Sequence, residues 1–298
     1  MLNKKIWKHP PDIFKRCYEN KNENNIAVSA VGRRGLIRLE LDANSDSKTF
    51  VSNLQSKAPL LVQKALYPDT EFPLMAKIYI MSSSGGVLER DRLEIDIIAL
   101  EKTSSIFTTQ AATKIYKMDK GYASQEINIY MHKGSYLEFI PEQIIPYGSS
   151  RFYQSVNLKL EANCTVVYCE ILSAGRMASG EIFDFDICFL QMAAYDEKDN
   201  IIFADTMNIQ PDKYRKYIQY AFGYKMILLN LYIITKTIDY KTLDHNITNI
   251  IKDQSLYGSC SALPNEYGMV IRMLSDSVDE TKCFARSVSS VIRGFVFG

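Results

Sequence analysis

Alternation of apolar and polar residues with a period of two recurs along this chain and constrains its fold most strongly. Ile37, Leu39 and Leu41 alternate with Arg38 and Glu40. The same pattern returns in three later segments: 92–99, 152–161 and 182–190. Successive side chains of a strand point to opposite faces, so each segment predicts a half-buried strand. A polar outer face is typical of antiparallel sheets, and we therefore predict a mainly β protein whose sheets are mostly antiparallel.

Two segments near the C-terminus break this pattern and predict helices. Apolar residues recur at helical spacing between Asp239 and Asp253, and again between Asp276 and Ile292, where Asp276 or Ser277 is suited to cap the helix. The stretch 210–220 predicts a third, short helix, opened by Pro211.

The domain organisation follows from composition. Residues 1–25 are polar, and we expect a loosely ordered N-terminal arm there. No break in composition divides residues 26–298, which predicts one large β domain. Regular alternation of strands and helices is absent from the sequence, which argues against a nucleotide-binding α/β sheet.

The overall charge and hydrophobicity limit the classes of partner and the cellular compartment that we expect for the chain. The formal net charge is +1 and 47% of the residues are hydrophobic, so we expect a folded protein that binds no nucleic acid. The most apolar run, 226–234, is too short to span a bilayer, and the N-terminus lacks a signal-peptide core. We therefore expect a soluble cytoplasmic protein without a membrane partner.

Sequence motifs for catalysis are missing. No GxxxxGK[ST], GxSxG or HExxH pattern occurs, and the three histidines, His9, His132 and His245, lie far apart in sequence. The chain is therefore predicted not to be an enzyme. Two alternatives stay open: a hydrolase whose site is assembled only in three dimensions, and a β module that binds a carbohydrate or a peptide.

Two weak signals each have an ordinary alternative. Asp184 and Asp186 are expected to share one strand face, where they could hold a hard cation or Ni²⁺, but solvated carboxylates are the norm on such a face. Lys114 is a conceivable catalytic lysine, yet an anchoring salt bridge is the more ordinary role.

Six segments, in order, resemble the urease accessory protein UreD family, also called UreH. The segments are APLLVQKALYPD (58–69), SSSGGVLERDRL (82–93), TTQAATKIY (108–116), LEFIPEQIIPY (137–147), AGRMASGEIF (174–183) and LPNEYGMVIRMLSDS (263–277). One departure is visible: Arg90 stands where the family usually has Gly before Asp91. This departure affects the expected conformation of the turn, because Arg is poorly suited to a positive φ.

The motif residues also have a structural interpretation, as residues that form or fix turns, bends and strand ends. Gly85 and Gly86 predict a tight turn, which Asp91 could cap through backbone N–H groups. Arg176 and Glu181 could form an ion pair that pins a bend bracketed by glycines. The remaining residues assigned to this structural class are Thr108, Thr109, Lys114, Tyr116, Pro141, Gly175, Gly180 and Arg272.

The resemblance implies a non-enzymatic scaffold for the maturation of urease, a nickel enzyme. Members of the family bind the urease apoprotein and recruit UreF, through which the GTPase UreG is engaged for nickel delivery. The family fold is mainly β, with layered, helically wound strands and a couple of helices. No stably bound cofactor is expected, although nickel could be held transiently.

A polar route for Ni²⁺ through the scaffold would need carboxylates on inward faces, where they are costly unless hydrated or paired. We choose Glu142 and Glu181 as the first candidates. The other candidates are Glu138, Glu170, Asp184 and Asp186. For partner binding we expect an exposed apolar surface at the tyrosine-rich stretch 214–224 and on the C-terminal helix, unless these residues pack on the β core.

Overall fold

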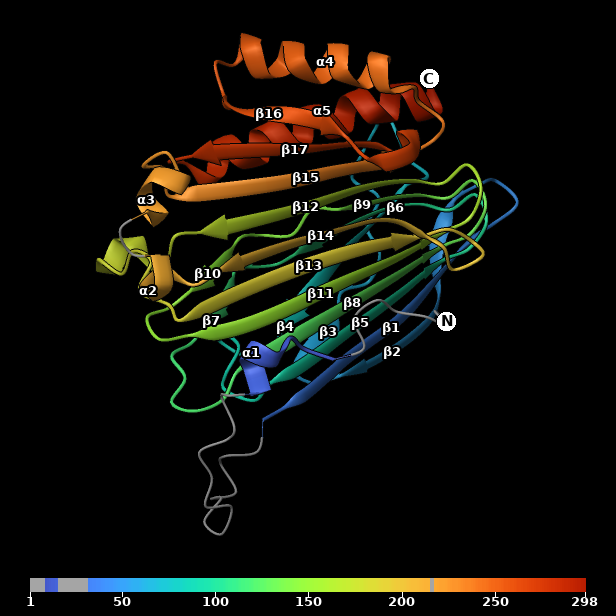
Figure 1. Ribbon diagram of the computed structural model, residues 1–298. Helices are drawn as coiled ribbons and strands as arrows, with labels where there is room; N and C mark the ends of the chain where they lie inside the picture. The colour runs from blue at the N-terminus through green and yellow to red at the C-terminus, as the bar shows by residue number, and fades with distance from the viewer. Residues whose placement is uncertain (1–8, 16–31, 215–216) are drawn as a thin grey trace.

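Two β-sheets that pack against each other form the frame of the molecule (Figure 1). The structure is a computed structural model and describes residues 9–15, 32–214 and 217–298. The first sheet has seven strands in the order β14-β13-β11-β8-β5-β1-β2. Its strands are β1 (Arg34–Ala43), β2 (Thr49–Lys57), β5 (Arg92–Ala99), β8 (Ala123–Met131), β11 (Arg151–Leu160), β13 (Ile187–Tyr195) and β14 (Ile201–Ile209).

The second sheet has ten strands, with the main order β16-β17-β15-β12-β9-β6-β4-β3, and β10 pairs with β12 and β7. Its strands are β3 (Leu60–Val62), β4 (Ala76–Ser82), β6 (Ser104–Thr109), β7 (Thr113–Ile115), β9 (Tyr136–Phe139), β10 (Ile144–Pro146), β12 (Thr165–Ser173), β15 (Ile227–Thr235), β16 (Tyr257–Ala262) and β17 (Gly268–Ser275).

The chain winds between the two sheets. From β4 onward it places β5 in the first sheet, β6 in the second, β8 in the first, β9 in the second, and then β11 and β12 in the same alternation. The mainly β, layered and wound architecture is thereby confirmed.

The predicted antiparallel pairing is wrong for the centre of both sheets. The neighbours β1, β5, β8, β11 and β13 pair in parallel, as do β4, β6, β9 and β12. In each turn of the winding, the chain crosses to the other sheet and then comes back to the first sheet. It enters that sheet in the same direction each time, so successive strands of one sheet are parallel. Antiparallel pairs occur at the ends of the winding, for example between β1 and β2 and between β15 and β17.

The core lies between the sheets and follows the alternation that the sequence showed. Ile37, Leu39 and Leu41 of β1 point inward and are buried. Ile78 of β4 and Phe139 of β9 meet them from the second sheet in the same apolar cluster. Period two therefore identified the buried face of each strand, although it did not identify the direction of pairing.

Two long helices cover the outer face of the second sheet (Figure 1). Helix α4 (Tyr240–Asp253) is capped by Asp239, and helix α5 (Val278–Phe297) by Ser277. Both predicted C-terminal helices are confirmed. Phe284 and Val288 of α5 are fully buried against this sheet. Within the described residues, no helix has the length and apolarity that crossing a membrane requires.

Shorter helices mark the connections and the N-terminal segment. The predicted helix at 210–220 is two short helices, α2 (Pro211–Tyr214) and α3 (Ile218–Ala221). The remaining short elements are α1 (Asp12–Lys15), η3 (Met177–Ser179) and η4 (Pro264–Glu266).

The predicted loose arm lies mainly outside the described residues, but its described part is docked. Phe14 of α1 is 1% exposed and packs against Tyr122, Tyr153 and Phe189 on the outer face of the first sheet. An aromatic residue within a polar segment therefore anchors residues 9–15 to the sheet.

The predicted strand at 182–190 begins only at Ile187. Phe183 has a positive φ of 54°, which interrupts the extended backbone, although Phe183 and Phe185 are still buried. Asp184 and Asp186 consequently precede the strand and do not share one of its faces, so that expectation was wrong.

Replacing Phe284 with Ala should lower the free energy of unfolding by about 3 to 5 kcal/mol, because it leaves a cavity under α5. Phe295→Ala on the same helix is the matched control, since Phe295 is 45% exposed, and it should have a much smaller effect. Urea unfolding measures both. Equal losses in the two variants would contradict the packing of α5 described here.

Candidate functional site

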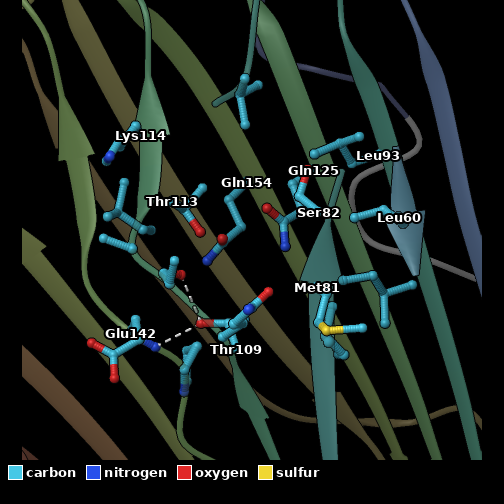
Figure 2. A pocket seen from close by; sticks show the side chains of 18 of the residues that line it. Leu60, Met81, Ser82, Leu93, Thr109, Thr113, Lys114, Gln125, Glu142 and Gln154 are labelled. Carbon is cyan, nitrogen blue, oxygen red and sulfur yellow. Dashed lines mark hydrogen bonds between the residues drawn. The ribbon is translucent and has the colours of Figure 1, made fainter. Parts of the chain in front are cut away.

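A cavity of about 260 Å³ lies between the two sheets and opens at one end (Figure 2). Apolar side chains such as Leu60 and Leu93 form part of its wall. The polar residues that line it include Gln125 of β8, Gln154 of β11 and Glu170 of β12. Gln125 and Gln154 are partners across neighbouring strands. We call this space the central cavity.

The mouth of the central cavity is built from three of the segments that resemble the UreD family. They contribute residues 82, 84–86, 109–114 and 141–142, which lie at or after the ends of β4, β6 and β9. The backbone N–H of Glu142 donates to Thr109 Oγ1 at 2.9 Å, as Figure 2 shows, and the N–H of Val87 donates to the carbonyl of Lys114 at 2.8 Å. Segments distant in sequence are thus tied together around one opening.

Gly86 permits the close approach of two of these segments. A Cβ atom at Gly86 would lie 2.7 Å from the carbonyl oxygen of Lys114, a distance that requires a backbone shift. The hydroxyl of Tyr116 donates to the carbonyl of Gly85 at 3.2 Å. Lys114 itself is exposed at the mouth and forms no salt bridge with the described residues, so the predicted anchoring salt bridge is absent there.

Asp91 fixes the turn that leads away from the mouth. Its buried carboxylate accepts backbone N–H bonds from Leu88 and Arg33, both at 2.9 Å, and pairs with the guanidinium of Arg33 at 2.5 Å. The same guanidinium donates to the carbonyl of Gly86 at 3.1 Å. Arg90 adopts the positive φ, 69°, to which the family's Gly is suited. The hydrogen bonds of Asp91 help to offset a conformation that costs about 1 to 2 kcal/mol.

Glu170 is the buried carboxyl group of the central cavity. Gln154 Nε2 donates to Glu170 Oε1 at 2.7 Å, which bridges the two sheets. Burial raises the pKa of Glu170 to about 7, against the opposing effect of hydrogen bonds from Asn230 and Gln154. Glu170 forms no salt bridge with the described residues, and its pKa of about 7 means that this carboxyl group can exchange a proton near neutral pH.

A row of polar residues continues from Glu170 across the second sheet. Asn230 of β15 lies opposite Glu170, and Arg272 of β17 lies opposite Asn230. Asn230 is 3% exposed, and its Oδ1 has no hydrogen-bond partner. Arg272 pairs with Asp205 of β14 at 2.5 Å. Because these residues lie in register on one face, they form a row of polar side chains that leads from the central cavity.

The polar row ends at an open groove of about 720 Å³, which is lined by Asn230, Arg272 and apolar side chains. The groove exists because β14 is the last strand of the first sheet, whereas the second sheet continues through β15, β17 and β16. Tyr217 and Tyr257 stand at the groove and are 68% and 62% exposed.

The six predicted carboxylates fall into three places. Glu170 lies in the central cavity, and Glu142 lies at its mouth, where it pairs with Lys282 at 2.5 Å. Glu138 is buried outside the cavity, because its side chain points toward α5. There Arg293 binds it at 2.5 and 2.8 Å and Tyr136 donates to it at 2.6 Å.

The other three carboxylates lie at a separate corner. The predicted ion pair between Arg176 and Glu181 is present, and the hydrogen bond from Arg176 is the main reason that the pKa of Glu181 is lowered. Asp186 pairs with Arg151 at 2.6 Å, and Asp184 is exposed. Gly175 has φ 142° and Gly180 has φ 78°, so both glycines serve the bend at this corner.

Metal-binding side chains are not clustered in the way a resident metal centre requires. Within residues 9–15, 32–214 and 217–298, no group of three or more His, Cys, Asp or Glu side chains is arranged to hold a metal ion. The central cavity therefore offers one buried carboxyl group and amide oxygens, which are weak ligands for a divalent cation.

Comparison with known proteins identifies the family of this chain. The family model for the UreD urease accessory protein matches residues 33–298. The chain belongs to the UreD urease accessory protein family. It is 33% identical over 260 residues to the urease accessory protein UreD of Cenarchaeum symbiosum, covering 87% of this chain and 91% of the relative. These relatives are named as accessory proteins, which confirms the prediction that this UreD-family chain is not an enzyme.

Bacterial relatives extend the match. Urease accessory protein UreD 2 of Brucella ovis is 29% identical over 284 residues, covering 94% of this chain and 93% of the relative. UreD of Photorhabdus laumondii is 28% identical over 276 residues, covering 92% and 86%.

Sequence reasoning missed Gln125, Gln154 and Asn230. A usable signal existed for Gln154, because it occupies an inward position in the alternation of β11, between Phe152 and Val156. A polar residue at such a position must find a partner, and here the partner is Glu170.

Glu170→Gln should change how stability depends on pH. The folded protein keeps a proton that the unfolded chain loses above about pH 4.5, so wild-type stability should fall, relative to the variant, as pH rises to about 7. The difference should reach about 3 kcal/mol and then stay constant. Urea unfolding at pH 5, 6, 7 and 8 measures it, and parallel profiles for the two proteins would contradict the burial of this carboxyl group.

Proposed function

We propose that this UreD-family chain is a scaffold for urease maturation that passes Ni²⁺ through its central cavity. The observation that supports this most is the position of Glu170. It is a buried carboxyl group without a salt-bridge partner among the described residues, and it lies in a cavity whose mouth is formed by segments typical of the family.

The chemistry of Glu170 suits a cation that must be held briefly and released. Its pKa of about 7 means that Ni²⁺ has to displace a proton to bind near neutral pH, which weakens the binding. The amide oxygens of Gln125 and Asn230 and water molecules could complete the coordination, since Ni²⁺ accepts oxygen ligands. A weak site of this kind favours transfer over storage.

The proposed route has two ends. At the mouth, Glu142 is the first carboxylate that an entering cation meets. Beyond Glu170, the row through Asn230 leads to the open groove, where the carboxylate of Asp205 accepts hydrogen bonds from Tyr232 and Arg272. The other four candidate carboxylates of the sequence lie outside this route, so we assign it to Glu142 and Glu170.

The partners follow from the family. We infer that the chain binds the urease apoprotein and UreF, and that UreG joins through UreF. Tyr217, Tyr220 and Tyr224 are each at least 60% exposed, which supports the tyrosine-rich stretch as a partner surface; the side chain of Tyr214 lies outside the described residues. The apolar side of α5 packs on the sheet, which leaves Phe295 and Phe297 partly exposed near its end.

The route is tested by the nickel content of urease activated with this chain, UreF and UreG at limiting Ni²⁺. Glu170→Gln and Glu142→Gln should each lower nickel incorporation, by about tenfold for Glu170 because its site loses the charge that attracts the cation. Glu101→Gln is the control, since Glu101 is exposed in the turn between β5 and β6 and should have no effect.

Co-purification of the variants with the partner proteins distinguishes a role in assembling the complex from a role in passing the metal. Both cavity variants should still co-purify with urease apoprotein and UreF, because Glu142 and Glu170 lie away from the exposed tyrosines. Normal nickel incorporation in both variants would rule out the route and leave the scaffold role standing. Loss of co-purification would show that these residues act through the assembly.

A further inference from the structure

A second groove lies between helix α5 and the outer face of β4, β6 and β9, and it shares Glu142 with the mouth of the central cavity. Its volume is about 650 Å³. Lys282, Arg286, Ser289 and Arg293 line it from α5, and their spacing of four, three and four residues places them on one helix face. Lys77 of β4 lines it from the sheet. We call this space the basic groove.

The two ends of the basic groove are neutralised by carboxylates. At one end, Arg293 pairs with Glu138 at 2.5 Å and with Asp69 at 2.9 Å. At the other end, Lys282 pairs with Glu142 at 2.5 Å. These pairs hold α5 against the sheet and leave their cations with little attraction for a ligand.

The middle of the basic groove has positive charge that no described carboxylate balances. Arg286 is exposed and has no hydrogen bond or ion pair with the described residues. The Lys77 ammonium lies 5.4 Å from the ring centroid of Tyr79 and likewise has no carboxylate partner among them. Two cations that line one groove favour a ligand that carries negative charge.

A buried hydroxyl group at the same place lacks a partner. Ser289 lines the basic groove and is 1% exposed, yet its Oγ has no hydrogen-bond partner. Buried polar groups are nearly always hydrogen-bonded, so a hydroxyl without a partner, in the same groove as two cations that no described carboxylate balances, indicates a missing ligand. Ser289 is one helical turn from Arg286, so both can reach one small ligand.

We propose that the middle of the basic groove binds a small oxyanion of the size and charge of phosphate. Arg286 supplies planar N–H donors, Lys77 a point charge, and Ser289 a hydroxyl donor. A free phosphate and a phosphoryl group on a larger molecule share this chemistry, and we assign the free anion. The residues that would hold the anion, Arg286, Lys77 and Ser289, do not line the central cavity and are not part of the nickel route, which is assigned to Glu142 and Glu170.

Calorimetric titration of the full chain with inorganic phosphate tests the site, at fixed low ionic strength in chloride. We expect saturable binding of one anion, weakened about tenfold in Arg286→Gln and in Lys77→Gln through the loss of a charge-assisted hydrogen bond. Arg34→Gln is the matched control, because Arg34 is exposed at the start of β1 and outside the groove. It should bind phosphate as the wild type does.

Thermal unfolding provides a second readout. Phosphate should raise the melting temperature of the wild type and of Arg34→Gln, but not that of Arg286→Gln. Ser289→Ala should weaken phosphate binding without lowering the melting temperature in its absence, because the hydroxyl has no partner to lose.

Three outcomes would overturn the assignment. They are no saturable binding of phosphate, equal weakening in Arg34→Gln and Arg286→Gln, and binding of a synthetic diglutamate peptide at this groove without binding of phosphate. The last outcome would identify a docking site for an acidic protein segment in place of a small-anion site.

Discussion

Each turn of this chain crosses from one sheet to the other and back, so the parallel strands of a sheet all end at the same edge. In the second sheet β4, β6 and β9 run side by side in this way. The segments that follow these strands are therefore brought together although they are far apart in the sequence, and they form the mouth of the central cavity. Parallel pairing thus determines where the functional residues can gather.

The cavity itself reflects a balance between packing and polarity. Apolar side chains close most of the space between the sheets, but Gln125, Gln154 and Glu170 occupy inward positions. The hydrogen bond from Gln154 to Glu170 satisfies one lone pair of the carboxyl group, and burial keeps its pKa high. A protein that needed only stability would be better served by apolar residues at these positions, so their presence favours a function for the cavity.

The sequence predicted which strand faces are buried, the two long C-terminal helices and the family. It did not predict the parallel pairing, because alternation shows which face is buried and carries no information about strand direction. It also could not separate Glu138 from Glu170. Both lie among apolar residues in strands buried on both faces, yet Glu138 points to Arg293 of α5 and Glu170 points into the cavity.

We propose that Glu170 exchanges a proton for a cation inside the central cavity, and the nickel route depends on this exchange. Titration of the full chain with Ni²⁺ near pH 7, in two buffers of different ionisation enthalpy, measures proton release directly. We expect weak, saturable binding with release of up to one proton, and loss of that release in Glu170→Gln. Absence of saturable binding, or the same proton release in wild type and variant, would contradict it.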